Sequence, residues 1–84
     1  MGEINKLEVK VGDSLYMIQG EEGLDRLQQI GEIVSRKYDA IKTAMPGYPN
    51  NRVAVLVAFQ LAEELLQLQA DYAQLVAEAE AAHF

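Results

Sequence analysis

The first regular pattern along the chain is an alternation of apolar and polar residues. It covers Lys6–Val11, is followed by Gly12 and Asp13, and leads into a second, mostly apolar run at Ser14–Ile18. Such alternation is typical of a half-buried strand, and glycine followed by aspartate between two runs indicates a tight hairpin turn. With a two-residue turn the pairs on one face are Val11 and Ser14, Val9 and Tyr16, and Leu7 and Ile18. The opposite face would carry Glu8, Lys10, Leu15 and Met17, which is half apolar without an obvious local cover.

From Gly20 onward the apolar spacing becomes that of a helix. The stripe consists of Leu24, Leu27, Gly31, Val34, Tyr38, Ile41 and Met45. It predicts an amphipathic helix of about 24 residues, with Glu21, Glu22 and Asp25 at its start and Lys42 near its end, where these charges suit the helix dipole. Gly31 leaves two interpretations open: another backbone passes close there, or the helix simply tolerates a glycine.

Two prolines then interrupt the helical pattern. Pro46 and Pro49 lack the backbone N–H that a helix needs, so Met45–Asn51 is predicted to be a loop. Asn50 or Asn51 would cap the next helix. That helix meets no breaker before the chain ends and is predicted to run for about 32 residues, or about 48 Å.

The last predicted helix carries more apolar surface than a small core can cover. Val53–Ala62 is apolar at every position except Gln60, whereas a helix facing one core normally shows a single apolar stripe. A heptad pattern continues along Ala54, Ala58, Leu61, Leu65, Leu68, Tyr72, Leu75, Ala79 and Ala82, with a second stripe at Phe59, Ala62, Leu66, Ala73 and Val76. This spacing predicts packing against copies of the same helix. The candidate self-association residues are Val55, Leu56, Phe59, Leu61, Leu65, Leu68, Tyr72 and Leu75.

These elements predict an α+β fold: an N-terminal β-hairpin followed by two α-helices, the second long and forming an intermolecular coiled coil. Residues 1–62 would form a small head completed by dimerisation, and 63–84 the coiled-coil tail.

In the heptads the acids Glu64, Asp71 and Glu78 occupy g positions. A parallel pair sets them against uncharged e positions, whereas an antiparallel pair brings acid rows together, so we expect a parallel dimer and two dimers meeting tail to tail.

Composition narrows the class of protein. The 84 residues are 50% hydrophobic and contain no cysteine, which argues against disorder and against a disulfide framework, so oligomerisation is the remaining common way to complete a small core. The net charge is −6; the seven Lys and Arg all lie in residues 1–52, and 53–84 hold five acids with no Lys or Arg. Nucleic acid and anionic membranes are therefore not expected as partners.

The chain has no signal-like start and its all-round apolar segment is shorter than the roughly 20 residues of a membrane span, so we expect a cytoplasmic protein.

Residues for catalysis are scarce. His83 is the one histidine and lies next to the last residue, while Ser14 and Ser35 have no base in a recognisable motif. Adjacent acids such as Glu63 and Glu64 point away from each other on a helix and are read as solvated charge. We expect no enzyme activity, no metal and no cofactor.

The order of these segments resembles the ZapA family of bacterial cell-division proteins. The resemblance rests on V-x-V-G-x-S-L at Val9–Leu15, the acidic start at Gly20–Asp25, the first helix to Lys42, and N-x-x-A-V-L-x-A-F-x-L-A-x-E-L at Asn51–Leu65, and it covers the chain from about Leu7 onward. It implies a regulator that binds the tubulin-like protein FtsZ, bundles its filaments and stabilises the midcell ring as a dimer or tetramer. The alternative is a generic oligomerisation or adaptor module without FtsZ binding.

The resemblance also suggests partner-binding residues. Some relatives carry a basic residue at the hairpin turn, where this sequence has Asp13, while the basic position late in the first helix is matched by Lys42. The partner-binding candidates are therefore Arg36, Lys37 and Lys42, with Asp13 at the turn.

Overall fold

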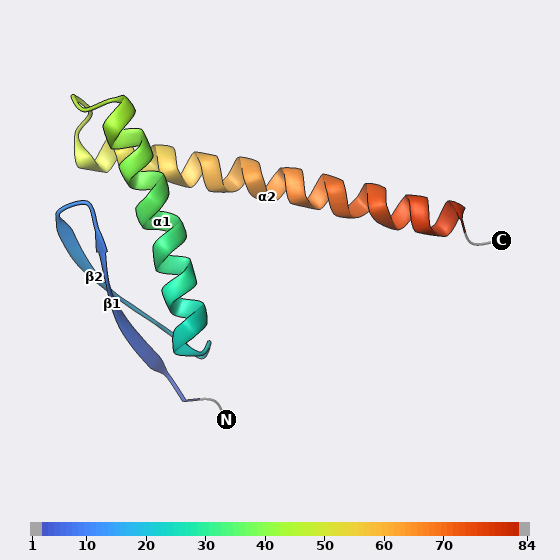
Figure 1. The fold of residues 1–84 in the computed structure, drawn as a ribbon, viewed down its shortest axis with the longest axis horizontal. Coiled ribbons are helices and arrows are strands. Elements are labelled where there is room, and N and C mark those ends of the chain that lie inside the picture. The colour runs from blue at the N-terminus through green and yellow to red at the C-terminus, as the bar shows by residue number, and fades with distance from the viewer. Residues whose placement is uncertain (1–2, 83–84) are drawn as a thin grey trace.

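The computed structural model describes residues 3–82 and contains the four predicted elements in the predicted order (Figure 1). Strands β1 (Asn5–Val11) and β2 (Ser14–Gly20) form a hairpin, and helices α1 (Leu24–Ala44) and α2 (Asn50–Ala81) follow. The predicted α+β class, with a hairpin and a long second helix, is confirmed. His83 lies outside the described residues.

The hairpin has the register that the alternation predicts. β1 and β2 are antiparallel, and Val9 pairs with Tyr16 and Leu7 with Ile18. The turn requires glycine at Gly12 for two reasons. Its φ of 60° lies in the left-handed region, and a Cβ there would lie 2.7 Å from Cε1 of Tyr38.

Helix α1 begins later than predicted. It has 21 residues and starts at Leu24, so Asp25 lies in its first turn as predicted, whereas Glu21 and Glu22 precede the helix. The backbone of Glu22 is held by β1, because the side-chain amide of Asn5 donates a hydrogen bond of 2.8 Å to its carbonyl oxygen. This hydrogen bond links the strand to the loop that precedes the helix.

The start of α2 also differs from the prediction. Pro49 is the N-cap, Asn50 is already the first helical residue, and neither asparagine makes a side-chain capping bond. The carbonyl oxygen of Pro49 accepts hydrogen bonds from the backbone N–H groups of Arg52 (3.0 Å) and Val53 (3.1 Å). Pro49 has the extended backbone that is usual for an N-cap residue, with φ −68° and ψ 156°, and its carbonyl oxygen accepts these bonds without a side-chain cap.

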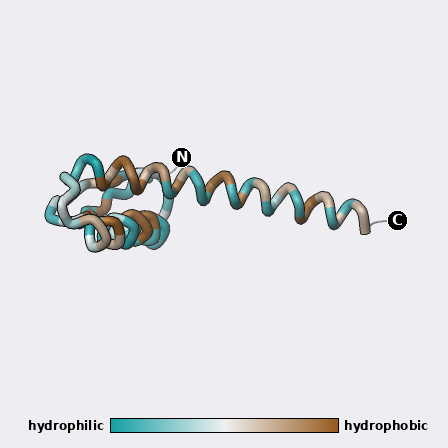
Figure 2. The backbone as a smooth tube through the Cα atoms, turned by 90° about the horizontal axis from the view of Figure 1, so that it is seen from above, coloured by the Kyte–Doolittle hydropathy of each residue, from teal (hydrophilic) through white to brown (hydrophobic). Residues whose placement is uncertain are grey.

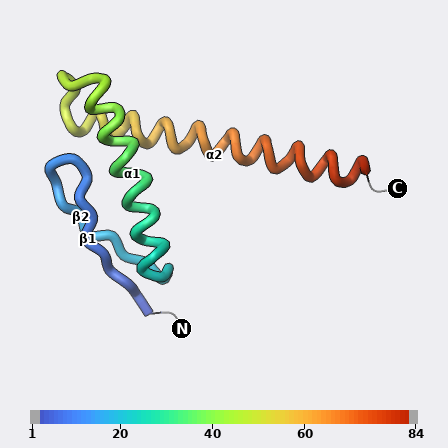
Figure 3. Tube along the Cα trace, viewed as in Figure 1, coloured from blue at the N-terminus to red at the C-terminus, as the bar shows by residue number. Residues whose placement is uncertain are grey.

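The core lies where α1 crosses the first turns of α2. Tyr38 and Ile41 of α1 are buried against Val53 and Val57 of α2, and Leu27 is buried further down α1. The hairpin packs against the same apolar stripe of α1, because Gly31 and Tyr38 on that stripe meet Val9 and Gly12. The hairpin and the first turns of α2 therefore cover different lengths of one face of α1 (Figures 1 and 3).

Most of α2 extends away from the other elements. Viewed from above, it continues as a single rod with hydrophobic positions recurring along its length (Figure 2). The radius of gyration is 17.2 Å, whereas a compact domain of this length has about 12 Å. The chain alone is therefore far from a closed globule.

Another segment does pass close to Gly31. The neighbour is a side chain, however, and not the backbone that the sequence suggested as one of two explanations for this glycine. A Cβ on Gly31 would lie 2.8 Å from Cγ2 and 2.9 Å from Cγ1 of Val9. Valine is stiff at χ1, so this contact cannot be relieved by a simple side-chain rotation.

We expect Gly31→Ala to destabilise the fold by about 1 kcal/mol, because the overpacking against Val9 outweighs the roughly 1 kcal/mol gained in helix propensity. Denaturant unfolding should show this loss, and the double variant with Val9→Ala should lose less than the sum of the single changes. Gly47→Ala is the matched control, since a Cβ there meets nothing within 4 Å. A Gly31→Ala protein at least as stable as the parent would contradict the prediction.

Burial chiefly raises the pKa of Tyr38 above its ordinary value, and the nearby Tyr16, Asp13 and Asp39 raise it further. A raised pKa means that the folded state favours the neutral form of Tyr38. The stability that this preference contributes to the fold is complete below about pH 10 and is lost as the pH rises through the folded pKa. Thermal unfolding should therefore show a smaller alkaline loss of stability for Tyr38→Phe than for the parent. An alkaline loss of stability as large in the Tyr38→Phe protein as in the parent would refute the assignment.

Candidate functional site

The largest exposed apolar surface runs along α2. Its members are Val55, Phe59, Leu65, Leu66, Leu68, Tyr72 and Leu75, each more than half exposed. Of the eight residues predicted for self-association, six belong to this set. Leu56 and Leu61 are instead half-buried and pack against the core of the head.

The polar residues of α2 gather on another side of the helix. Gln67 donates a hydrogen bond to Asp71 (2.9 Å) and Gln74 donates one to Glu78 (3.1 Å), each four residues apart. Glu64 continues this row and forms an ion pair with Lys37 of α1. Beyond the head, α2 is thus amphipathic, with an apolar face that nothing in the described chain covers.

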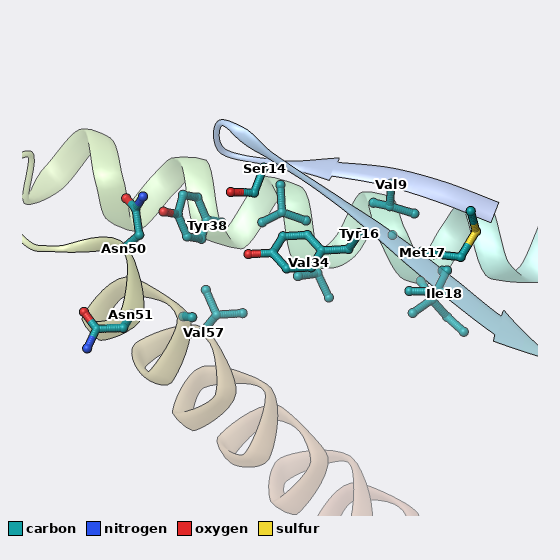
Figure 4. A pocket seen from close by; sticks show the side chains of 14 residues that line it. Val9, Ser14, Tyr16, Met17, Ile18, Val34, Tyr38, Asn50, Asn51 and Val57 are labelled. Carbon is teal, nitrogen blue, oxygen red and sulfur yellow. The ribbon is translucent and has the colours of Figure 1, made fainter. Parts of the chain in front are cut away.

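A groove of about 600 Å³ opens between β2, α1 and the first turns of α2 (Figure 4). Tyr16 and Ile18 come from β2, Val34 and Tyr38 from α1, and Val57 from α2. We call it the head groove. Its lining is predominantly apolar, with Ser14, Asn50 and Asn51 among its polar members. Among residues 3–82 no group of three or more His, Cys, Asp and Glu side chains is placed to hold a metal ion.

The side of the hairpin that faces away from α1 forms a separate small surface. Its members, which we call the outer hairpin face, are Lys6, Glu8, Lys10, Leu15, Met17 and Gln19. The register places Lys10 opposite Leu15 and Glu8 opposite Met17. All six residues are exposed, so the half-apolar face expected from the alternation is left without an intramolecular cover.

The basic residues predicted on the first helix do not form one surface. Arg36 is widely exposed and lies 3.9 Å from Glu32, while Lys37 forms its ion pair with Glu64. Lys42 donates a hydrogen bond of 2.7 Å to the carbonyl oxygen of Tyr48. Two of the three lysine and arginine side chains thus make contacts within the chain that hold α1 to α2 and to the loop.

Asp13 lies at the hairpin tip, close enough to Tyr38 to influence its pKa. The roles of Arg36, Lys37, Lys42 and Asp13 in partner binding stay predictions. Lys6 and Lys10 were not among the predicted partner residues. The same alternation that predicts the strand places them on the face of Leu15 and Met17, with Lys10 opposite Leu15, and this signal was available in the sequence.

Helix α2 is also long and apolar enough, by length and composition only, to cross a membrane; an 18-residue window has a mean hydropathy of 1.3. This is weak support for a span, because helices of other kinds satisfy the same criterion. Glu63 and Glu64 lie near the middle of α2, and a charge at the centre of a span costs about 2.5 to 3.5 kcal/mol. The absence of membrane contact therefore stays a prediction. Its support is the pair of acids, because the length of the apolar segment does not exclude a span.

Comparison with solved structures relates the fold to a known architecture. A ZapA mutant dimer from Geobacillus stearothermophilus superposes with a TM-score of 0.73 at 24% sequence identity, covering 95% of this chain and 93% of that chain. This likeness establishes the fold. A comparison with curated proteins found no match.

The family comparison covers almost the whole chain. The family model described as cell division protein ZapA matches residues 7–83, which include all but the first two residues of the hairpin, both helices and the loop between them. The same elements carry the head groove, the outer hairpin face and the uncovered side of α2. The chain therefore belongs to the ZapA family of cell-division proteins.

Proposed function

We propose that this protein is a cytoplasmic, non-enzymatic regulator that binds FtsZ, bundles its filaments and stabilises the division ring at midcell. It acts as a dimer, or as a dimer of dimers, whose heads each make a weak contact with a filament. The observation that carries the proposal is the uncovered apolar face that continues along α2 beyond the head. Membership of the ZapA family supports the choice of process and of partner.

Self-association follows from the amount of apolar surface that one chain leaves exposed. Phe59 and Val55 face water although burial of one large apolar side chain contributes roughly 1.5 to 3 kcal/mol. The head groove borders the same side of α2, because Ala54 lines the groove and also begins the heptad stripe. A second copy of α2 lying along the stripe would therefore cover both features in one interface.

The proposed division of labour is a head at 1–62 and a tail at 63–84. Lys37 and Glu64 make their ion pair near this boundary, and the tail beyond it projects freely. With a parallel dimer formed through α2, two dimers joined through their tails hold their head pairs apart by a distance on the order of 48 Å. Heads at that separation can contact neighbouring filaments simultaneously, and weak contacts then act together.

The alternative, a plain oligomerisation module, needs the α2 stripe but no apolar surface on the hairpin. Leu15 is 62% exposed on the outer hairpin face, away from the head groove that the proposed coil covers. This surface favours a protein that also contacts another molecule. Co-sedimentation with polymerised FtsZ decides between the two functions, since an oligomerisation module would stay in the supernatant.

We expect no compact monomer at micromolar concentration, because a monomer would leave the whole α2 face in water.

Leu68→Glu or Leu75→Glu should convert a tetramer into a folded dimer, since both residues lie beyond the head and a buried, unpaired carboxylate is costly. Sedimentation velocity with circular dichroism measures both properties. Gln67→Glu is a control with the same change of charge on the polar side of α2. Complete unfolding of either leucine variant would show that head and tail form one cooperative unit.

The Leu75→Glu dimer should still bind FtsZ filaments but bundle them poorly, because it presents only one pair of heads. Co-sedimentation reports binding, and electron microscopy or light scattering of the same samples reports bundling. The Gln67→Glu control should bundle as the parent does. Bundling by the Leu75→Glu dimer at the parent level would show that spacing by the tail is not the mechanism.

A further inference from the structure

We propose that the outer hairpin face is the surface through which each head contacts its filament partner. The complementary surface on that partner would present apolar side chains beside carboxylates. The inference rests on the proposed function and adds to it the contact surface and its chemistry.

The apolar part of this surface is built by the strand alternation. Leu15 lies opposite Lys10 on the side of the sheet away from α1, and its side chain is 62% exposed. Met17 lies two positions along the same strand and also reaches the rim of the head groove. A molecule that fills the head groove could therefore cover Met17 but would leave Leu15 exposed on the outer hairpin face.

The charge on this face differs from that of the whole protein. Lys6 and Lys10 stand with a single acid, Glu8, so the face is positive in a chain whose net charge is −6. Within the described residues neither lysine takes part in a salt bridge, whereas Lys37 is bound by Glu64. Two ammonium groups beside an apolar ridge suit a partner that offers carboxylates around an apolar contact.

The size of the face decides between a second copy and another protein. Seven residues at about 3.3 Å each give a length of about 23 Å, and two strands of about 4.8 Å width each give a footprint of roughly 220 Å². A stable interface buries about 800 Å² on each partner. The face is too small to hold two copies of this chain together by itself, but it suits a weak contact that is repeated in every head of an oligomer.

The hairpin tip adds a charge of the opposite sign. Asp13 follows Val11 and Gly12 at the end of β1, so it stands next to the positive face. A carboxylate there repels the carboxylates proposed on the partner. Removing that charge should therefore strengthen binding, which is a result that a misfolded variant cannot imitate.

The test is co-sedimentation of the intact protein with polymerised FtsZ at low salt and at 0.3 M KCl, about twice physiological ionic strength. We expect Leu15→Ser to weaken binding about tenfold, as loss of a central apolar contact does. Lys10→Glu should weaken it about fivefold and flatten its salt dependence, and Asp13→Asn should strengthen it about twofold. Leu24→Ser and Arg26→Glu make the same chemical changes at exposed positions of α1 and should bind as the parent does.

Each other outcome has a definite meaning. If the parent binds and the Leu15 and Lys10 variants bind equally well, the inference is overturned while the proposed function stands. If the parent itself does not bind, the proposed function fails and the inference falls with it. If Leu15→Ser lowers the oligomeric state in sedimentation velocity, the face contacts a second copy and the inference is overturned.

Discussion

The contact on which the rest of this structure depends is the crossing of α1 over the first turns of α2. Tyr38 and Ile41 meet Val53 and Val57 there, and Val53 is fully buried. This small core joins the hairpin and α1 to a helix that is much longer than the head. Because it occupies only the start of α2, it anchors the helix while leaving the remaining turns free to meet other chains.

Contacts around this crossing also determine which charges are available at the surface. Lys37 is held by Glu64, and Lys42 is held by the carbonyl oxygen of Tyr48, whose ring lies 4.3 Å from the guanidinium carbon of Arg52. Several of the basic groups near the crossing therefore serve the fold of the chain itself. On the hairpin, Lys6 and Lys10 share a face with the exposed side chains of Leu15 and Met17.

In the proposed assembly, the parts of the protein have separate tasks. The α2 face brings copies together, the tail separates the head pairs, and the hairpin makes individually weak filament contacts. An oligomer of this kind gains avidity from geometry, so no single contact has to be strong. Weak and repeated contacts also dissociate quickly one at a time, which suits a regulator of filaments that must be remodelled during division.

The sequence by itself determined the elements and their faces. The period-two run specified the hairpin register, the heptads specified the uncovered side of α2, and two prolines specified the break between helices. Both observed helix starts differ from the predicted ones. The residues before α1 are linked to the distant strand β1 through Asn5 and Glu22, and α2 begins on the backbone of Pro49 and not on an asparagine side chain. Only the tertiary structure decided that Val9 fills the space at Gly31 and that Lys37 and Lys42 are engaged within the chain. Periodicity records which side of an element a residue occupies, whereas the neighbour it meets there is decided by the packing of distant segments.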